Sequence, residues 1–215
     1  MSSTIYAIEA TRLTYHIGSF VLDSHDWTVS SGECVVLHGP NGAGKTTMLK
    51  LLAGIYRPKS GGIRIFGHDL WKDPLQAKNH LGYVSVLPQA LRHLTGREFV
   101  TFIAGLYPKT WPQDIDSLVA LLGLVLAWND PISSYSYGML QKLCLIAQLS
   151  HEPLLLLIDE PGYGFDEPSL LNLLDILERY RNSNHALVVA SHDPRFIHHH
   201  GWRSVRLEHG KVLSG

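Results

Sequence analysis

The sequence predicts an α/β fold in which a mostly parallel sheet is interrupted by a helical insert. Short apolar segments alternate with helical patterns over about 1–89 and 146–215, whereas the stretch between them carries only helical patterns. We therefore expect a single domain, 1–215, with a core and β-subdomain formed by about 1–89 and 146–215 and a helical subdomain over about 90–145. In such a fold, ligands bind at the carboxyl ends of the parallel strands.

The first strands are predicted from short apolar runs bounded by glycine, proline or polar residues. They cover residues 5–10, 20–22, 27–29, 34–37, 62–67 and 83–87. The run 34–37 is apolar without a break, as a strand covered on both faces should be. A helix is expected soon after it, with Met48, Leu51 and Leu52 on one side and Gly54 at its end.

Helical patterns dominate the middle of the chain, and strands return after them. Thr95 and Glu98 form a capping box ahead of apolar residues at helical spacing. Further helices are expected over 112–123, after Gly138 and over 168–181. The later strands are expected over 154–158 and 186–190, followed by a hairpin of 204–207 and 211–213.

Composition excludes several classes of protein. The chain has 215 residues, of which 45% are hydrophobic and 17% charged, so it is globular and not disordered. Its net charge of −1 gives no overall basic field for binding nucleic acid or anionic lipid. No apolar run approaches the roughly 18 residues that span a bilayer, and the start lacks the pattern of a signal peptide. We therefore expect neither a membrane-spanning nor a secreted protein, while attachment to a membrane remains open.

A phosphate-binding loop joins the apolar strand 34–37 to the helix after it. Gly39, Gly44, Lys45 and Thr46 have the P-loop spacing, and an ordinary glycine-rich turn matches it by chance in about 1% of chains this long. Backbone N–H groups of such a loop surround a polyphosphate, the lysine adds positive charge, and the threonine hydroxyl ligates Mg²⁺. The expected contacts are Gly39, Pro40, Asn41, Gly42, Ala43, Gly44, Lys45, Thr46 and Thr47.

Two carboxylates end the apolar strand 154–158. Asp159 stands where P-loop proteins that hydrolyse nucleotides hold Mg²⁺, here through water, and Glu160 suits a general base for the attacking water. Two surface acids at the end of a strand would give the same pattern. An enzyme that transfers phosphate to a second substrate would not need Glu160. Beside a P-loop, hydrolysis is therefore the sharper hypothesis.

Four further segments matter beside these two motifs. They are Tyr-Val-Ser-Val-Leu-Pro-Gln at 83–89, Tyr-Ser-Tyr-Gly-Met at 135–139, Gly-Tyr-Gly-Phe-Asp at 162–166 and Ala-Ser-His-Asp at 190–193. With them the chain resembles the ATP-binding cassette (ABC) family over nearly its whole length. The resemblance implies a P-loop NTPase (RecA-like) core with a small antiparallel β-subdomain and an inserted α-helical subdomain. Its cofactors would be ATP and Mg²⁺.

The resemblance also assigns roles to single residues. Gln89 would contact Mg²⁺ and the attacking water, and His192 would bind the γ-phosphate and help hold that water. Ser136 and Gly138 belong to the family's signature, which binds the γ-phosphate held by the other subunit of a head-to-tail dimer. Asp166 would reach across the same dimer. Tyr15 stands where the family keeps an aromatic residue that stacks on adenine, although it could equally be a core residue on a strand face.

Two positions of the signature depart from the common pattern. Tyr137 and Met139 replace glycine and glutamine, which leaves two possibilities: the Tyr137 side chain points away from the phosphate, or this half-site is weakened. We interpret the segment as a functional variant. The segment 162–166 resembles the family's D-loop and is also irregular, at Gly162 and Tyr163.

The resemblance implies an ATPase subunit that powers separate membrane-spanning subunits. The segments 94–98 and 135–139 are most similar to ATPases of two-component bacterial exporters. The expected partners are a second nucleotide-binding subunit, identical or paralogous, and a separate permease, with no nucleic acid. The expected location is the cytoplasmic face of the inner membrane. Alternatives are a soluble ABC ATPase acting on ribosomes or DNA, and a nucleotide-sensing regulatory subunit with little turnover.

Overall fold

The computed structural model describes residues 5–85, 91–108 and 115–213. The chain divides into two compact units. The first unit comprises 1–82, 154–161 and 180–215, and the second comprises 83–153 and 162–179. The second unit therefore contains the predicted insert together with flanking residues and most of the helix that follows Asp166.

A six-stranded, largely parallel sheet runs in the order β11-β10-β4-β9-β8-β7. Neighbours among the four strands β10, β4, β9 and β8 pair in parallel, and β11 is antiparallel to β10. The bounds are β4 Cys34–His38, β7 Leu81–Val84, β8 Leu155–Asp159, β9 Ala186–Ala190, β10 Arg203–Glu208 and β11 Lys211–Leu213. Every residue of β9 is buried, as are the first four of β4 and of β8, which confirms that the unbroken apolar runs are covered strands.

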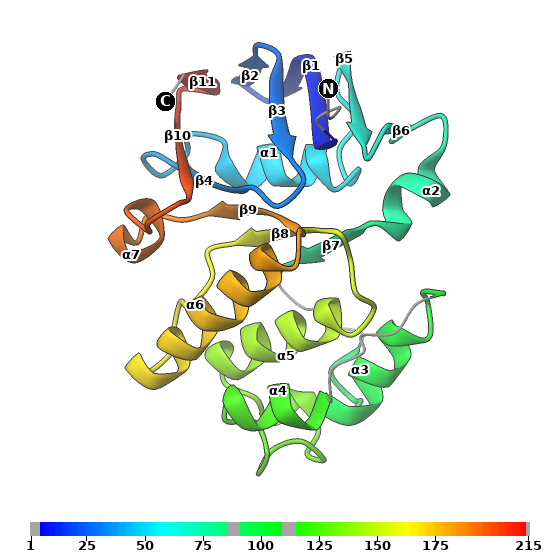
Figure 1. Cartoon of the computed structure of the whole chain (residues 1–215), viewed down its shortest axis with the longest axis vertical. Helices are drawn as coiled ribbons and strands as arrows, with labels where there is room; N and C mark the ends of the chain where they lie inside the picture. The colour runs from blue at the N-terminus through cyan, green and yellow to red at the C-terminus, as the bar shows by residue number, and fades with distance from the viewer. Residues whose placement is uncertain (1–4, 86–90, 109–114, 214–215) are drawn as a thin grey trace. The chain divides into compact units, whose positions relative to one another are not determined.

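A smaller antiparallel sheet completes the first unit. Its order is β2-β1-β5-β6, and β3 also pairs with β1. The bounds are β1 Tyr6–Ile17, β2 Phe20–Ser24, β3 Trp27–Ser30, β5 Ser60–Ile65 and β6 His68–Asp69. Figure 1 shows α1, Lys45–Leu52, between this sheet and the strands β4 and β9. The predicted combination of a parallel core sheet and a small antiparallel subdomain is confirmed.

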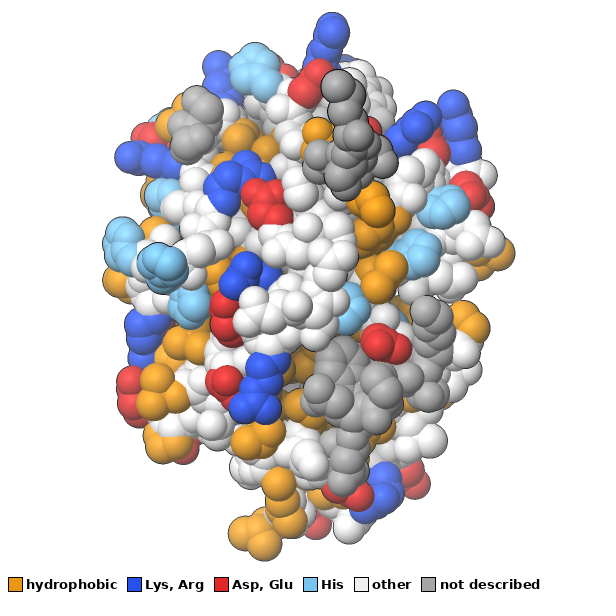
Figure 2. Space-filling model, in the orientation of Figure 1, with side chains coloured by type: hydrophobic (Ala, Val, Ile, Leu, Met, Phe, Trp, Pro, Cys, Tyr) orange, Lys and Arg blue, Asp and Glu red, His pale blue; other side chains and the backbone are white. Residues whose placement is uncertain are grey.

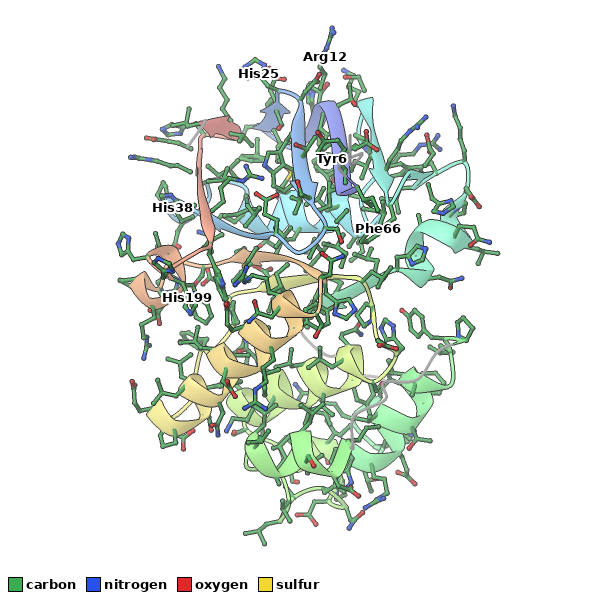
Figure 3. All side chains as sticks on the ribbon, viewed as in Figure 1. Tyr6, Arg12, His25, His38, Phe66 and His199 are labelled. Atoms are coloured by element: carbon green, nitrogen blue, oxygen red, sulfur yellow. The ribbon has the colours of Figure 1, made fainter. Side chains whose placement is uncertain are left out.

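β1 extends to Ile17, well beyond the predicted strand 5–10. The second half was not predicted because a β-bulge interrupts the alternating pattern of the sequence. Arg12 has a positive φ of 41°, and the register with β5 shifts between Thr11 and Thr14. The inward-facing residue therefore changes from an even position, Ala10, to an odd one, Leu13, so the alternation of period two is lost. Figure 3 shows Arg12 at the outer end of this sheet.

Among the described residues, four short elements were not predicted. These are β6, α2 at Pro74–Asn79, the 3₁₀ helix η2 at Ile132–Ser134 and α7 at Pro194–Ile197. Each has six residues or fewer, too few for a hydrophobic period to stand out. In place of the predicted strand 83–87 the structure has β7, which begins and ends earlier. Residues 86 and 87 of the prediction lie outside the described part of the chain.

The second unit is helical, as predicted. Its helices are α3 Gly96–Ala104, α4 Ile115–Leu121, α5 Tyr137–Leu149 and most of α6, Glu167–Asn182. α5 contacts both α3 and α4 and buries the apolar residues of its middle. The predicted capping box at α3 is confirmed, because the Glu98 N–H donates to Thr95 Oγ1 at 3.2 Å and the Thr95 N–H donates to Glu98 Oε2 at 2.8 Å.

The surface carries both signs of charge. Figure 2 shows basic and acidic side chains interspersed over the face in view, in keeping with the net charge of −1. Among the described helices, none combines the length and the apolar character needed to cross a membrane.

Candidate functional site

The phosphate-binding loop lies where the sequence predicts it, between the carboxyl end of β4 and the first residue of α1. Gly39 and Gly44 have φ values of 149° and 104°, which favour glycine. A side chain at Gly39 would collide with the backbone carbonyl of Leu207, and one at Gly44 would come within 2.6 Å of Phe20 Cζ. The loop therefore needs glycine at both positions, for its backbone conformation and for space.

Lys45 is buried at the first position of α1. Its Nζ donates to the carbonyl oxygens of Gly39 at 2.9 Å and Pro40 at 3.4 Å. The same ammonium is 3.8 Å from Glu160 Oε1. The charge of Lys45 is thus held inside the loop, beside the amino terminus of α1, where an anionic phosphate is favoured.

The parallel pairing of β8 and β9 sets the positions of the two predicted carboxylates. Asp159 is the last residue of β8 and pairs with Ala190. The Glu160 N–H donates to the Ala190 carbonyl oxygen at 2.8 Å, and Glu160 has a positive φ of 47°. A positive φ is uncommon for a residue with a side chain, and strained backbone of this kind is typical of functional sites.

Three side chains converge on these acids. Thr46 Oγ1 donates to Asp159 Oδ1 at 3.2 Å, and His192 Nδ1 lies 2.8 Å from Glu160 Oε2. Glu160 thus has Lys45 near one carboxylate oxygen and His192 at the other. The structure therefore brings Lys45, Thr46, Asp159, Glu160 and His192 together at one edge of the sheet.

The oxygen ligands fit a hard divalent cation. Burial raises the pKa of Asp159, and the hydrogen bond from Thr46 only partly opposes this. A cation beside this carboxylate would offset the cost of its burial, and a hydroxyl with one carboxylate is the limited protein ligand set typical of Mg²⁺ on a nucleotide. No cluster of three His, Cys, Asp or Glu residues that could hold a metal occurs in the described ranges.

A cavity of about 520 Å³ opens above the loop. Its lining consists of Ile17, Phe20, residues 41–47 and Glu160, all in the first unit. Tyr15 is not in this lining. Its ring stacks on Tyr56 with centroids 5.1 Å apart and planes 8° apart. Ile17 and Phe20 were not predicted as site residues; the available signal was an apolar pair flanking the Gly18-Ser19 turn.

A family model described as ABC transporter matches residues 22–162. The chain belongs to the ABC transporter family of ATPases. Its fold is that of the family's P-loop ATP-binding cassettes: a solved structure described as the ATP binding subunit of an ABC transporter has a TM-score of 0.86 and 26% identity, covering 96% of this chain and 88% of that one.

Curated relatives carry names of the same family. The uncharacterized ABC transporter ATP-binding protein YhcH of Bacillus subtilis is 32% identical over 86% of this chain and 61% of its own length. The probable metal transport system ATP-binding protein of Thermotoga maritima is 32% identical over 86% and 75%. The bacitracin transport ATP-binding protein BcrA of Bacillus licheniformis is 30% identical over 86% and 61%. The chain spans between 50% and 69% of the length of the first four curated relatives that it matches.

The segment predicted as the family's signature, 135–139, leads into α5 in the second unit of this ABC protein. Ser136 is the N-cap residue, and its hydroxyl accepts from the Met139 N–H at 3.3 Å. The Tyr137 ring meets the Tyr163 ring edge-on at 5.5 Å, so the bulky side chain packs on the D-loop segment of its own chain. A Cβ on Gly138 would come within 2.5 Å of the Gly164 carbonyl oxygen.

The predicted D-loop acid is tied to the same helix. Asp166 Oδ1 lies 3.7 Å from Lys142 Nζ, and that ammonium also donates to Ser169 Oγ at 2.6 Å. A hydrogen bond from Ser169, followed by the Lys142 charge, lowers the pKa of Asp166. Gln89, the remaining predicted site residue, lies outside the described residues.

Proposed function

We propose that this chain, as a single nucleotide-binding domain, binds and hydrolyses MgATP to power an ABC transporter. The observation that carries the proposal is the position of Glu160, at the lining of the P-loop cavity and within reach of both Lys45 and His192. A carboxylate in this position suits activation of a water molecule beside a bound polyphosphate.

Each of these residues has a separate role in hydrolysis. Lys45 and the loop N–H groups bind the phosphates and offset the charge that develops in the transition state. Glu160 takes a proton from the attacking water, and His192 orients Glu160 and contacts the γ-phosphate. Thr46 and Asp159, the latter through water, would hold Mg²⁺, which when bound neutralises phosphate charge. We assign Gln89 to the same cation and water.

A second subunit completes each site in this proposal. Ser136, Gly138 and the amino terminus of α5 would bind the γ-phosphate held by the partner's P-loop, and Asp166 would reach across the dimer. The Tyr137–Tyr163 contact supports a functional signature, because it engages the tyrosine ring within its own chain. The partner is a second copy or a paralogue.

The membrane-spanning part of the transporter would belong to another chain, with this subunit peripheral on the cytoplasmic face. We propose export as its direction. Supporting this are the similarity of the segments 94–98 and 135–139 to exporter ATPases and the relative named for bacitracin transport. Co-purification with a polytopic membrane protein is the expected result, and recovery with ribosomes or DNA instead would contradict a transport role.

The experiment that tests hydrolysis is Glu160→Gln. This variant keeps the size of the side chain but cannot accept the proton, so we expect at least a hundredfold loss of kcat with MgATP binding retained. It should also accumulate an ATP-bound dimer in size-exclusion chromatography. Glu9→Gln, on β1 outside the cavity lining, is the matched control. Wild-type protein that hydrolyses no ATP even with its membrane partner would refute the enzyme assignment.

A further inference from the structure

We propose that Phe20 and Ile17, and not Tyr15, form the surface that receives the base of the nucleotide, so that the site binds ATP and GTP with similar affinity. This inference rests on the proposed function, because it takes the P-loop as the phosphate site. It adds the identity of the base-contact residues and the resulting breadth of substrate.

The two apolar residues are positioned by a tight hairpin. Ile17 ends β1, Phe20 begins β2, and the two pair across the Gly18-Ser19 turn. Both line the cavity that contains loop residues 41–47. The Phe20 ring lies against Gly44, since a Cβ there would be 2.6 Å from Phe20 Cζ. The apolar surface therefore adjoins the phosphate cradle directly.

Ile17 is an apolar side chain with much of its surface uncovered. It is 49% exposed, although it lines a cavity and precedes a turn where polar residues are common. A planar base placed against Ile17 and the Phe20 ring would remove apolar surface from water and gain ring contact. In this proposal, a nucleotide whose phosphates occupy the loop places its base against these two residues, which line the same cavity.

Tyr15 is engaged elsewhere in the first unit. Its ring stacks on Tyr56, and the Lys50 ammonium lies 5.3 Å from the centroid of the Tyr56 ring. These contacts join β1 to α1 and the residue stretch after it. Tyr56 covers one face of the Tyr15 ring, and Tyr15 is not among the residues that line the cavity.

This lining predicts weak discrimination between bases. Enzymes that distinguish adenine from guanine use hydrogen bonds to the base edges, whereas stacking and apolar contact accept any base. The polar side chains of the lining all come from the phosphate loop and from Glu160. Of these, Lys45 forms an ion pair with Glu160, and Thr46 donates a hydrogen bond to Asp159.

The test is a set of equilibrium binding measurements on the purified full chain with MgATP, MgGTP and magnesium tripolyphosphate. We expect ATP and GTP affinities within about threefold of each other in the wild type, since stacking is tolerant of base identity. Phe20→Leu should weaken both nucleotides by about tenfold and leave tripolyphosphate unchanged, because only the ring contact is removed. Phe20→Tyr keeps the ring and should bind like the wild type.

Three further variants separate the possible outcomes. Tyr15→Leu should leave nucleotide affinity unchanged, and Val21→Ala, exposed on β2 and outside the lining, is the control for the hairpin. Nucleotide affinity that falls with Tyr15→Leu and not with Phe20→Leu would overturn the inference, as would GTP binding more than tenfold weaker than ATP. Lys45→Ala should weaken all three ligands; if it weakens none, the proposed function itself fails.

Discussion

His151 is a buried histidine outside the candidate site. It is 1% exposed, and the Tyr107 ring lies parallel to it at a centroid distance of 3.5 Å. The Gln148 Oε1 atom accepts from the Tyr83 N–H at 3.1 Å and lies 3.3 Å from His151 Nε2, so Nε2 carries the proton. Nδ1 has no hydrogen-bond partner among the described residues, and burial lowers the pKa of His151 to about 4. The imidazole is therefore neutral in the folded chain.

This lowered pKa predicts a loss of stability in mild acid. The ordinary pKa is 6.5, so between pH 6.5 and about 4 the unfolded chain binds a proton that the folded chain does not. The contribution of neutral His151 is complete above this window and is lost as the pH falls through it. We expect His151→Gln to reduce the fall in unfolding free energy between pH 7 and pH 5 by roughly 2 kcal/mol.

The measurement is urea unfolding at both pH values. His200→Gln is the control, because this histidine is exposed. The comparison uses the change with pH and not the absolute stability, so the packing lost from the Tyr107 stack cancels. An equal pH dependence in wild type and His151→Gln would contradict the prediction.

Gly138 provides a residue-scale prediction in the signature. It lies in the first turn of α5, where alanine would ordinarily favour the helix by about 1 kcal/mol. Here a Cβ would lie 2.5 Å from the Gly164 carbonyl oxygen, so the backbone must shift. We expect Gly138→Ala to lower the free energy of unfolding by about 1–3 kcal/mol. Gly62→Ala, with no atom within 4 Å of the new Cβ, should be nearly neutral. Chemical unfolding that ranks Gly138→Ala as the more stable variant would refute this.

The candidate site shows which residue positions a sequence can predict. Lys45, Thr46, Asp159 and Glu160 follow from motifs whose spacing is local, and the structure brings them together with His192. Ile17 and Phe20 do not belong to a motif of this kind. They reach the cavity through the pairing of two strands across a hairpin. Tyr15 is two residues from Ile17, and only the position of Tyr56 shows that its ring is already stacked.

At the scale of the element, the capping box of α3 predicts a measurable effect on stability. Thr95 Oγ1 accepts from the Glu98 N–H, so Thr95→Ala leaves that donor without its partner. We expect a loss of about 1 kcal/mol in the free energy of unfolding, the usual effect of removing an N-cap. Thr101→Ala, at an exposed position within the same helix, is the matched control. If both variants unfold at the same denaturant concentration, the cap does not stabilise α3.

Elements with one uninterrupted pattern were predictable, and elements with a broken pattern were not. The covered strands β4, β8 and β9 carry continuous apolar runs, and α3 carries both a cap and a helical period. β1 carries two half-patterns that are out of phase because of the bulge at Arg12. The alternation of each half is therefore too short to be recognised as part of one strand.

At the scale of the whole molecule, the proposed ATP contacts are distributed over both units. Lys45, Asp159 and Glu160 belong to the first unit, whereas Ser136 and Asp166 belong to the second. In a head-to-tail dimer, the P-loop of one chain acts with the signature of the other. A defect in the P-loop of one chain and a defect in the signature of the other would then fall in the same site.

This geometry predicts rescue of activity when two inactive variants are mixed. Lys45→Ala removes phosphate binding, and Ser136→Asp adds a charge that repels the γ-phosphate while aspartate still serves as an N-cap. Each variant alone should hydrolyse little ATP. Half of the dimers in an equal mixture are mixed, and each of these has one site without either defect, so the mixture should recover about a quarter of wild-type activity. Ser136→Asn, which keeps the cap without the charge, controls for changes to α5. Activity in the mixture no higher than the mean of the two variants would show that the partner's signature does not complete the site.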